Sequence, residues 1–163
     1  MIKSLAFAAI ALVTAPSLVG PPWLSVEYPP NPMDPELRGA VLAVHTYHHG
    51  NTVWIPVTCS AEGLVKGQRR SIPCELTRTS RPAVYVLKER VTPTEGVWTL
   101  VFNAGGRGEG ATALVDVDQQ GQVLAVKVPT QGEGNRTWPA GVTDGDINLA
   151  LHKRAEAVRV AGR

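Results

Sequence analysis

The chain has 163 residues, of which 18% are charged and 44% hydrophobic, with 16 glycines, 13 prolines and a formal net charge of +2. This length fits one domain, because single hydrophobic cores typically serve about 100–200 residues, and it excludes a multidomain machine. So small a net charge excludes binding to nucleic acid or to an anionic membrane through bulk electrostatics. The many glycines and prolines favour a turn-rich β-protein.

Residues 1–20 have the three-part layout of a secretory signal peptide. Lys3 is the basic residue, an apolar stretch begins at Leu5, and small residues follow it. The apolar stretch is too short to span a membrane, which takes about 20 residues. Cleavage after Ala15 or Ser17 leaves no later segment of membrane-spanning length, so we expect a secreted or periplasmic protein. The alternative is that these residues form a strand of the mature fold.

The alternation of residues 21–130 predicts an all-β fold, an immunoglobulin-like antiparallel β-sandwich of about seven to eight strands. Stretches of alternating apolar residues recur about every 8–12 residues, with turn-forming residues between them. The clearest example places Trp98, Leu100 and Phe102 on one face of a strand. The expected strands are 23–28, 38–47, 52–62, 69–77, 83–89, 96–103, 111–118 and 122–129.

The two cysteines, Cys59 and Cys74, lie on the apolar faces of two neighbouring predicted strands. If the hairpin turns at Lys66 and Gly67, counting outward from the turn places the cysteines directly opposite each other, with Cα atoms about 4.5–5.5 Å apart. That distance suits a disulfide, and disulfides persist outside the cytoplasm. We therefore predict a Cys59–Cys74 disulfide, and the alternative is a pair of buried free thiols.

The spacing of apolar residues changes from strand-like to helical in the C-terminal part of the chain. Residues 131–142 are polar and rich in Gly and Pro, which predicts a linker. Residues 143–160 predict one amphipathic helix, in which Thr143 and Asp146 form a capping box and apolar residues then recur at helical spacing. This helix either packs on the sandwich or docks a partner.

Three of the four histidines are concentrated at His45, His48 and His49. Imidazole nitrogens are ligands for copper and zinc. On a straight strand, His45 and His49 lie about 13 Å apart, so one ion joins them only if the chain curls at the following turn. A copper or zinc site at these three residues is one hypothesis, and a solvated loop beside a half-buried His45 is the alternative.

No pattern in the sequence predicts catalysis. The glycine-rich run 105–110 has neither P-loop nor dinucleotide-binding spacing, and a strand is expected after it instead of a helix. The chain also lacks the G-x-S-x-G pattern of a nucleophile elbow. We therefore expect no enzymatic activity and no cofactor, apart from the copper or zinc of the metal hypothesis.

The segments 38–44, 85–87 and 96–101 follow one another in the order of strands found in small extracytoplasmic immunoglobulin-like domains. Over about residues 23–128 the chain resembles YtkA-like and FixH-like domains. This resemblance implies an immunoglobulin-like fold in the bacterial envelope, in a copper-handling or oxidase-assembly context. Because the mature chain retains only Met33 and no Met/His ligand motif, the resemblance assigns a copper role to no particular residue.

The residues together favour a non-enzymatic secreted or envelope protein that acts as a binding or interaction module. Its expected partner is a protein of the cell envelope and not a nucleic acid. The alternative, from another functional class, is a metal-binding or metal-delivery protein that uses the His cluster. A third class, an enzyme whose site assembles from loops, has no support in the sequence. The sequence leaves the identity of the partner and the oligomeric state open.

Overall fold

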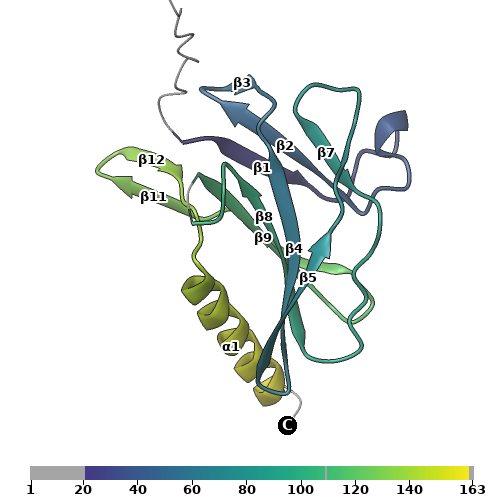
Figure 1. Ribbon diagram of the computed structural model, residues 1–163, viewed down its shortest axis with the longest axis vertical. Helices are drawn as coiled ribbons and strands as arrows, with labels where there is room; N and C mark the ends of the chain where they lie inside the picture. The colour runs from purple at the N-terminus through teal and green to yellow at the C-terminus, as the bar shows by residue number, and fades with distance from the viewer. Residues whose placement is uncertain (1–20, 109, 162–163) are drawn as a thin grey trace, which may run out of the picture.

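The computed structural model describes residues 21–108 and 110–161. The predicted signal peptide at residues 1–20 lies outside the described residues. The described part is an antiparallel β-sandwich of two five-stranded sheets, followed by a small hairpin and a C-terminal helix (Figure 1). The predicted all-β sandwich with one C-terminal helix is confirmed.

The first sheet has the strand order β1-β2-β7-β6, and β3 also pairs with β2. The second sheet has the order β10-β9-β8-β4-β5. The bounds of the first sheet are β1 (Trp23–Glu27), β2 (Leu42–His48), β3 (Asn51–Thr52), β6 (Thr77–Arg78) and β7 (Val84–Leu87), with a 3-10 turn, η1 (Pro35–Leu37), between β1 and β2. Those of the second sheet are β4 (Val57–Val65), β5 (Gln68–Cys74), β8 (Val97–Ala104), β9 (Ala111–Val117) and β10 (Val123–Lys127).

The strands predicted from the sequence correspond to β1, β2, β4, β5, β7, β8, β9 and β10. The short strands β3 and β6 were not predicted as separate strands, because two residues are too few to show an alternating pattern. Both pair with neighbouring strands of the first sheet, β3 with β2 and β6 with β7. The alternation of apolar residues therefore located the strands that carry the core.

The β4–β5 hairpin has the predicted register. Lys66 and Gly67 form its two-residue turn with φ angles of 50° and 78°, the positive values that a type I′ turn requires. In the register that this turn sets, Cys59 of β4 is the direct cross-strand partner of Cys74 of β5. The turn chemistry alone therefore set the pairing of the cysteines.

The main core lies between the two sheets. Leu42 and Val44 of β2 face Leu100 and Phe102 of β8 within one buried cluster. Trp98 lies so close to its cross-strand partner Gly63 that a Cβ atom at residue 63 would come within 2.5 Å of the indole ring. A glycine is therefore required at this position of β4 by the close approach of the tryptophan.

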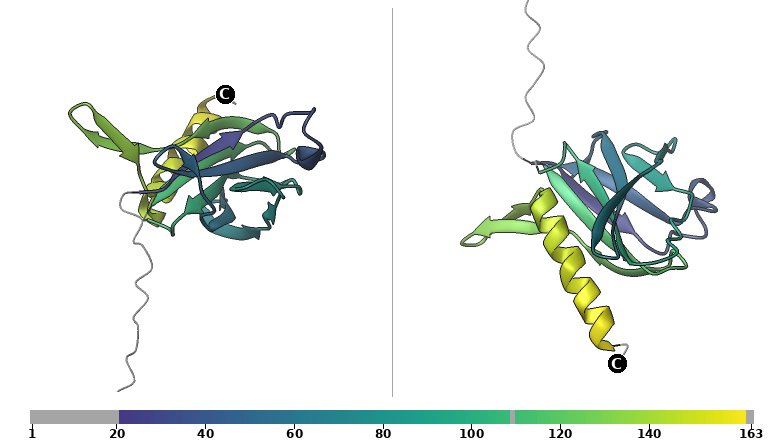
Figure 2. Two further views of the ribbon diagram at one scale, coloured as in Figure 1. Left: turned by 90° about the horizontal axis from the view of Figure 1, so that it is seen from above. Right: turned by 60° about the horizontal axis from the view of Figure 1, so that its bottom comes forward.

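The range predicted as a linker, 131–142, contains most of a second hairpin, β11 (Thr130–Glu133) and β12 (Arg136–Pro139). These strands pair only with each other in the described part of the chain, and they project from the body of the molecule (Figure 2). The segment has no alternating apolar residues, and most of its described side chains are exposed, with Pro139 at the end of β12 buried. The sequence of this hairpin therefore has the same pattern as that of a loop.

Helix α1 (Asp144–Ala161) packs across the outer face of the second sheet (Figures 1 and 2). The predicted capping box is confirmed, since the Asp146 amide donates to Thr143 Oγ1 at 3.3 Å and the Thr143 amide donates to Asp146 Oδ2 at 3.0 Å. Ile147 and Leu151 are fully buried against apolar side chains of β4 and β8. The N-terminal half of α1 is therefore part of the packed structure. In the described part of the chain, no helix is long and apolar enough to cross a membrane.

Candidate functional site

A row of polar residues crosses the outer face of the second sheet beneath α1. Ser71 of β5 pairs with Glu62 of β4, Glu62 pairs with Thr99 of β8, and Thr99 pairs with Asp116 of β9. Cross-strand partners have side chains on the same face, so these four side chains lie side by side. The carboxylates of Glu62 and Asp116 therefore lie under a helix. Each buried negative charge requires positive charges or hydrogen-bond donors from other parts of the chain.

Glu62 is the more buried of the two, with 1% of its side chain exposed. Arg69 donates to Glu62 Oε2 from Nε at 3.0 Å and from Nη2 at 2.7 Å, so two charge-assisted hydrogen bonds converge on one carboxylate oxygen. Arg107 donates to Glu62 Oε1 at 2.8 Å, and the hydroxyls of Ser60 and Ser71 donate to the same oxygen. We call Glu62, Arg69 and Arg107 with these two serines the Glu62 cluster.

The two arginines of the Glu62 cluster also reach α1. Arg107 donates to Asp144 Oδ1 at 2.7 Å, and Arg69 donates to the side-chain oxygen of Asn148. Asp144 and Asn148 belong to the first turns of the helix. The cluster therefore fastens the N-terminal end of α1 to β4 and to the β8–β9 loop.

The pKa of Glu62 reflects two opposing effects, burial and hydrogen bonding. Burial by itself raises the pKa of the carboxyl, but the hydrogen bonds from Ser60, Arg69, Arg107 and Ser71 outweigh it and lower the pKa from 4.5 to about 2. Glu62 is therefore ionised at neutral pH, and its charge stabilises the folded state.

Arg154 provides a second connection, further along α1. Its guanidinium donates to the Trp98 carbonyl at 2.6 Å, to Thr99 Oγ1 at 3.0 Å and to Asp116 Oδ1 at 3.1 Å. Thr99 Oγ1 also donates to Asp116 Oδ1 at 2.6 Å. The Asp116 carboxylate is thus compensated, and a second point of α1 is held over β8 and β9.

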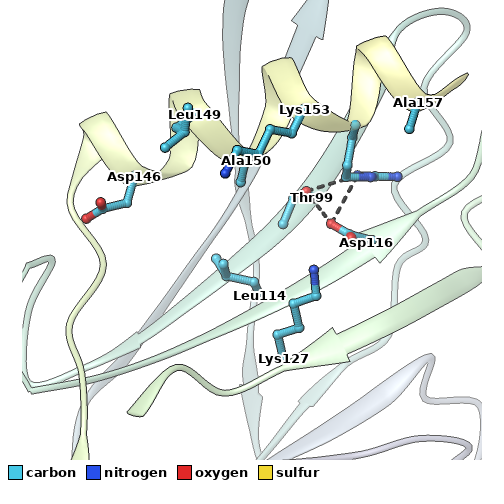
Figure 3. Close-up of a pocket in the computed structure, with 10 residues that line it drawn as sticks. Thr99, Leu114, Asp116, Lys127, Asp146, Leu149, Ala150, Lys153 and Ala157 are labelled. Atoms are coloured by element: carbon cyan, nitrogen blue, oxygen red, sulfur yellow. Dashed lines mark hydrogen bonds and ion pairs between the residues drawn. The ribbon is translucent and has the colours of Figure 1, made fainter. Parts of the chain in front are cut away.

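A groove of about 470 Å³ remains between α1 and strands β9 and β10. Figure 3 shows Leu149, Ala150 and Lys153 on the helix, opposite Leu114 of β9 and Lys127 of β10. Leu149 of α1 lines the groove and is 57% exposed. The volume falls within the range of ligand pockets, roughly 300–1,000 Å³, which typically combine apolar walls with a few polar groups.

The carboxylates that line the groove have hydrogen-bond partners within the protein, whereas two lysines that line it form no ion pair among the described residues. Asp116 accepts hydrogen bonds from Thr99 and Arg154, and Asp146 accepts from Thr143. Across the residues that the structure describes, neither Lys127 nor Lys153 takes part in an ion pair. The groove therefore offers two uncommitted positive charges beside an apolar surface.

The predicted histidine site is divided between two faces of β2. His45 points to the outer face, where its Nε2 lies 2.9 Å from Glu27 Oε2 of β1. His48 lies three residues later, on the opposite face of the strand, and its ring meets that of His49 edge to face at 4.2 Å between centroids. Within residues 21–108 and 110–161, no three His, Cys, Asp or Glu side chains are grouped as metal ligands. The histidine metal site stays a prediction.

The cysteines are adjacent, as the register predicts. Cys59 is buried and Cys74 is partly buried on β5, and both are thiols in this structure. The Cys59 thiol acts as the donor to the Cys74 sulfur, and this hydrogen bond raises the pKa of Cys59 and lowers the pKa of Cys74. Cys74, at the edge of the sheet, is therefore the sulfur that ionises more readily.

The Glu62 cluster and the groove are not indicated by any sequence motif. Position 62 alternates with the apolar positions of β4, and this alternation does not show whether the polar face of a strand is solvated or covered. One signal was present, because β8 is apolar on both faces, with Val97 and Val101 opposite to Trp98 and Leu100. A strand that is apolar on both faces indicates that something covers the outer face of its sheet.

Comparisons with known proteins identify no family for this chain. No protein-family model, no curated protein and no solved structure matches it. The resemblance to YtkA-like and FixH-like domains therefore stays a prediction.

We expect Glu62→Gln to destabilise the protein by about 3 kcal/mol at pH 7, because two arginines lose their buried counter-charge. The folded pKa of about 2 lies below the unfolded value of 4.5, so the Glu62 contribution is complete above about pH 5 and is lost as the pH falls toward 2. The difference between wild type and variant should shrink over that interval in urea denaturation experiments.

The matched control is Glu95→Gln, which removes the exposed ion pair between Lys66 and Glu95. Its cost should be below about 1 kcal/mol. Equal costs for the two variants, or a Glu62→Gln effect that does not change between pH 5 and pH 2, would contradict the assignment of Glu62 as the buried anchor.

Proposed function

We propose that this protein is a non-enzymatic binding module of the cell envelope or the extracellular space, and that the groove between α1 and β9–β10 is its binding surface. The observation that carries the proposal is the combination of exposed apolar side chains with the unpaired Lys127 and Lys153. The envelope location is supported by the layout of residues 1–20 and by the YtkA-like and FixH-like resemblance.

The way α1 is held supports this function. Ile147 and Leu151 are buried against the sheet, and the Glu62 cluster and Arg154 fasten the helix at two further points. One wall of the groove is formed by the sheet strands β9 and β10, and the other is this anchored helix. Binding sites on such ordered elements lose little conformational entropy when a ligand binds.

The proposed surface is tested by site-specific photo-crosslinking in cells of the source organism. A photoreactive amino acid at position 149 should give a covalent adduct with an envelope protein, since Leu149 lies at the groove. Lys127→Glu combined with Lys153→Glu should lower the yield of that adduct. The product is resolved by electrophoresis and mass spectrometry.

The control carries the photoreactive amino acid at Met33, which is 85% exposed in the connection between β1 and η1. That connection lies away from α1 (Figure 1). We expect no adduct from position 33. Adducts of equal yield from both positions, or from neither, would overturn the groove as the binding surface.

We also propose that Cys59 and Cys74 form a disulfide in the mature protein. The two residues are direct cross-strand partners, and the lowered pKa of Cys74 favours the thiolate that starts disulfide formation. Oxidation joins the two sulfurs and transfers two electrons and two protons to the disulfide-forming system of an oxidising compartment. The bond closes the β4–β5 hairpin at the end opposite to its turn.

Protein purified from its own compartment without reductant should gain the mass of two hydrogens on reduction, as measured by intact mass spectrometry. The disulfide should add about 3 kcal/mol to the free energy of unfolding. A Cys59→Ser/Cys74→Ser double variant should show neither response to reductant. Complete alkylation of both cysteines before any reduction would refute the bond.

Copper or zinc binding at His48 and His49 is the second candidate function. The observation that favours it is the buried Nε2 atom of His48, which has no hydrogen-bond partner in the described part of the chain. A buried polar atom without a hydrogen-bond partner destabilises the folded protein, and coordination of a metal ion would give this nitrogen a partner.

Titration of the full mature chain with Cu(II) and Zn(II), followed by calorimetry, tests this candidate. His48→Ala/His49→Ala should lower the affinity at least about tenfold, whereas His152→Ala, on α1, should not change it. Weak binding by the wild type, or equal affinity in the double variant, would rule the site out.

A further inference from the structure

We infer that β10 is an edge for strand addition, and that the partner presents an extended, acidic peptide segment that continues the second sheet beyond β10. This inference rests on the proposed function, since it names the chemistry of the ligand at the same groove. Three features of the described residues support it: the exposed edge, the apolar side chains along it, and the unpaired lysines beside it.

The first feature is the edge itself. Strand β10 ends the second sheet and pairs with β9 on one side only. The opposite edge, β5, contains Pro73, which cannot donate a hydrogen bond to an added strand. Residues 123–127 contain no proline, so the peptide groups on the outer side of β10 can bond to another strand. Of the two edges of this sheet, β10 is the better suited to accept a strand.

The second feature is the apolar surface at this edge. Leu124 is 61% exposed and Val126 is 39% exposed, and both belong to β10. Val126 pairs with Val115 of the main core, so it lies on the face of the sheet opposite to the groove, whereas Leu149 of α1 lines the groove. A strand laid along β10 would have side chains on both faces and would cover part of the apolar surface on each, which the hydrophobic effect would favour by about 25 cal/mol for each Å² of apolar area buried.

The third feature is the positive charge beside this edge, which favours an added strand with acidic side chains. Lys127 pairs with Leu114 of β9, so its side chain lies on the outer face of the sheet, toward the groove. A residue directly opposite Lys127 on an added strand would have its Cβ atom about 4.5–5.5 Å away. An acidic side chain there would lie beside Lys127 and near Lys153, whereas a basic one would be repelled.

The charge also disfavours the pairing of two copies of this chain. Lysines and bulges on edge strands are devices that prevent a sheet edge from pairing with its own kind. β10 has both, with Lys127 at its end and a register shift between Val123 and Ala125. Lys127 would repel the same lysine of a second copy but would attract an acidic segment. β10 therefore discriminates between partners by charge.

The test uses a capped synthetic peptide of about eight residues in which Glu alternates with Val, and a counterpart with Lys in place of Glu. Binding to the full mature chain is measured by calorimetry. The Glu peptide should bind, and the Lys peptide should bind at least about tenfold more weakly. Lys127→Glu should weaken the Glu peptide by a similar factor, while the matched control Lys88→Glu, outside the groove, should not.

Strand addition is tested with N-methylated forms of the Glu peptide. Alternate amides of a strand point to opposite sides, so methylation of one alternating set should abolish binding and methylation of the other set should leave it. Equal effects of the two sets would overturn strand addition.

The outcomes separate this inference from the proposed function. If the Glu peptide does not bind but the adduct from position 149 still forms, the acidic strand is wrong and the groove remains the binding surface. If neither is observed, both proposals fail. A concentration-dependent dimer of the chain in size-exclusion chromatography, together with no peptide binding, would show that a second copy occupies the edge and would overturn the acidic partner.

Discussion

The buried charge of Glu62 is the constraint around which the outer face of the second sheet is organised. A carboxylate that is 1% exposed requires charged or hydrogen-bonding partners, and Arg69 and Arg107 supply them from two different segments. Each arginine has donors left over, and these are used by Asp144 and Asn148 of α1. One buried charge thus connects Arg69 of β5 and Arg107, and through them the first turns of α1.

The groove is a consequence of where that helix lies. The buried side chains of α1 contact β4 and β8 near the middle of the sheet, so the helix covers these strands. The second sheet continues through β9 to β10, and there the helix leaves a gap with Leu149 and Lys153 at its margin. Incomplete coverage of a five-stranded sheet by a single helix therefore produces a surface that is apolar, positively charged and open at the edge.

The candidate site was less predictable than the fold because its residues are brought together by contacts across several strands. Arg107 lies in the glycine-rich run, which sequence patterns distinguish only from phosphate-binding loops, and its partner Glu62 is 45 residues earlier in the chain. The histidines show the same limit. His45 and His48 are close in sequence, but the alternation of β2 places them on opposite faces, and Glu27 of β1 lies beside His45.

Local interactions were readable from the sequence alone. The period-2 alternation located the strands of the sandwich, the Lys66-Gly67 turn set Cys59 opposite Cys74, and the capping box located the start of α1, because each depends on residues near one another in the chain. Only the tertiary structure decided which face α1 covers, which partners neutralise Glu62, and which lysines remain unpaired. Those properties depend on packing between segments that are far apart in the chain, and no local pattern records that packing.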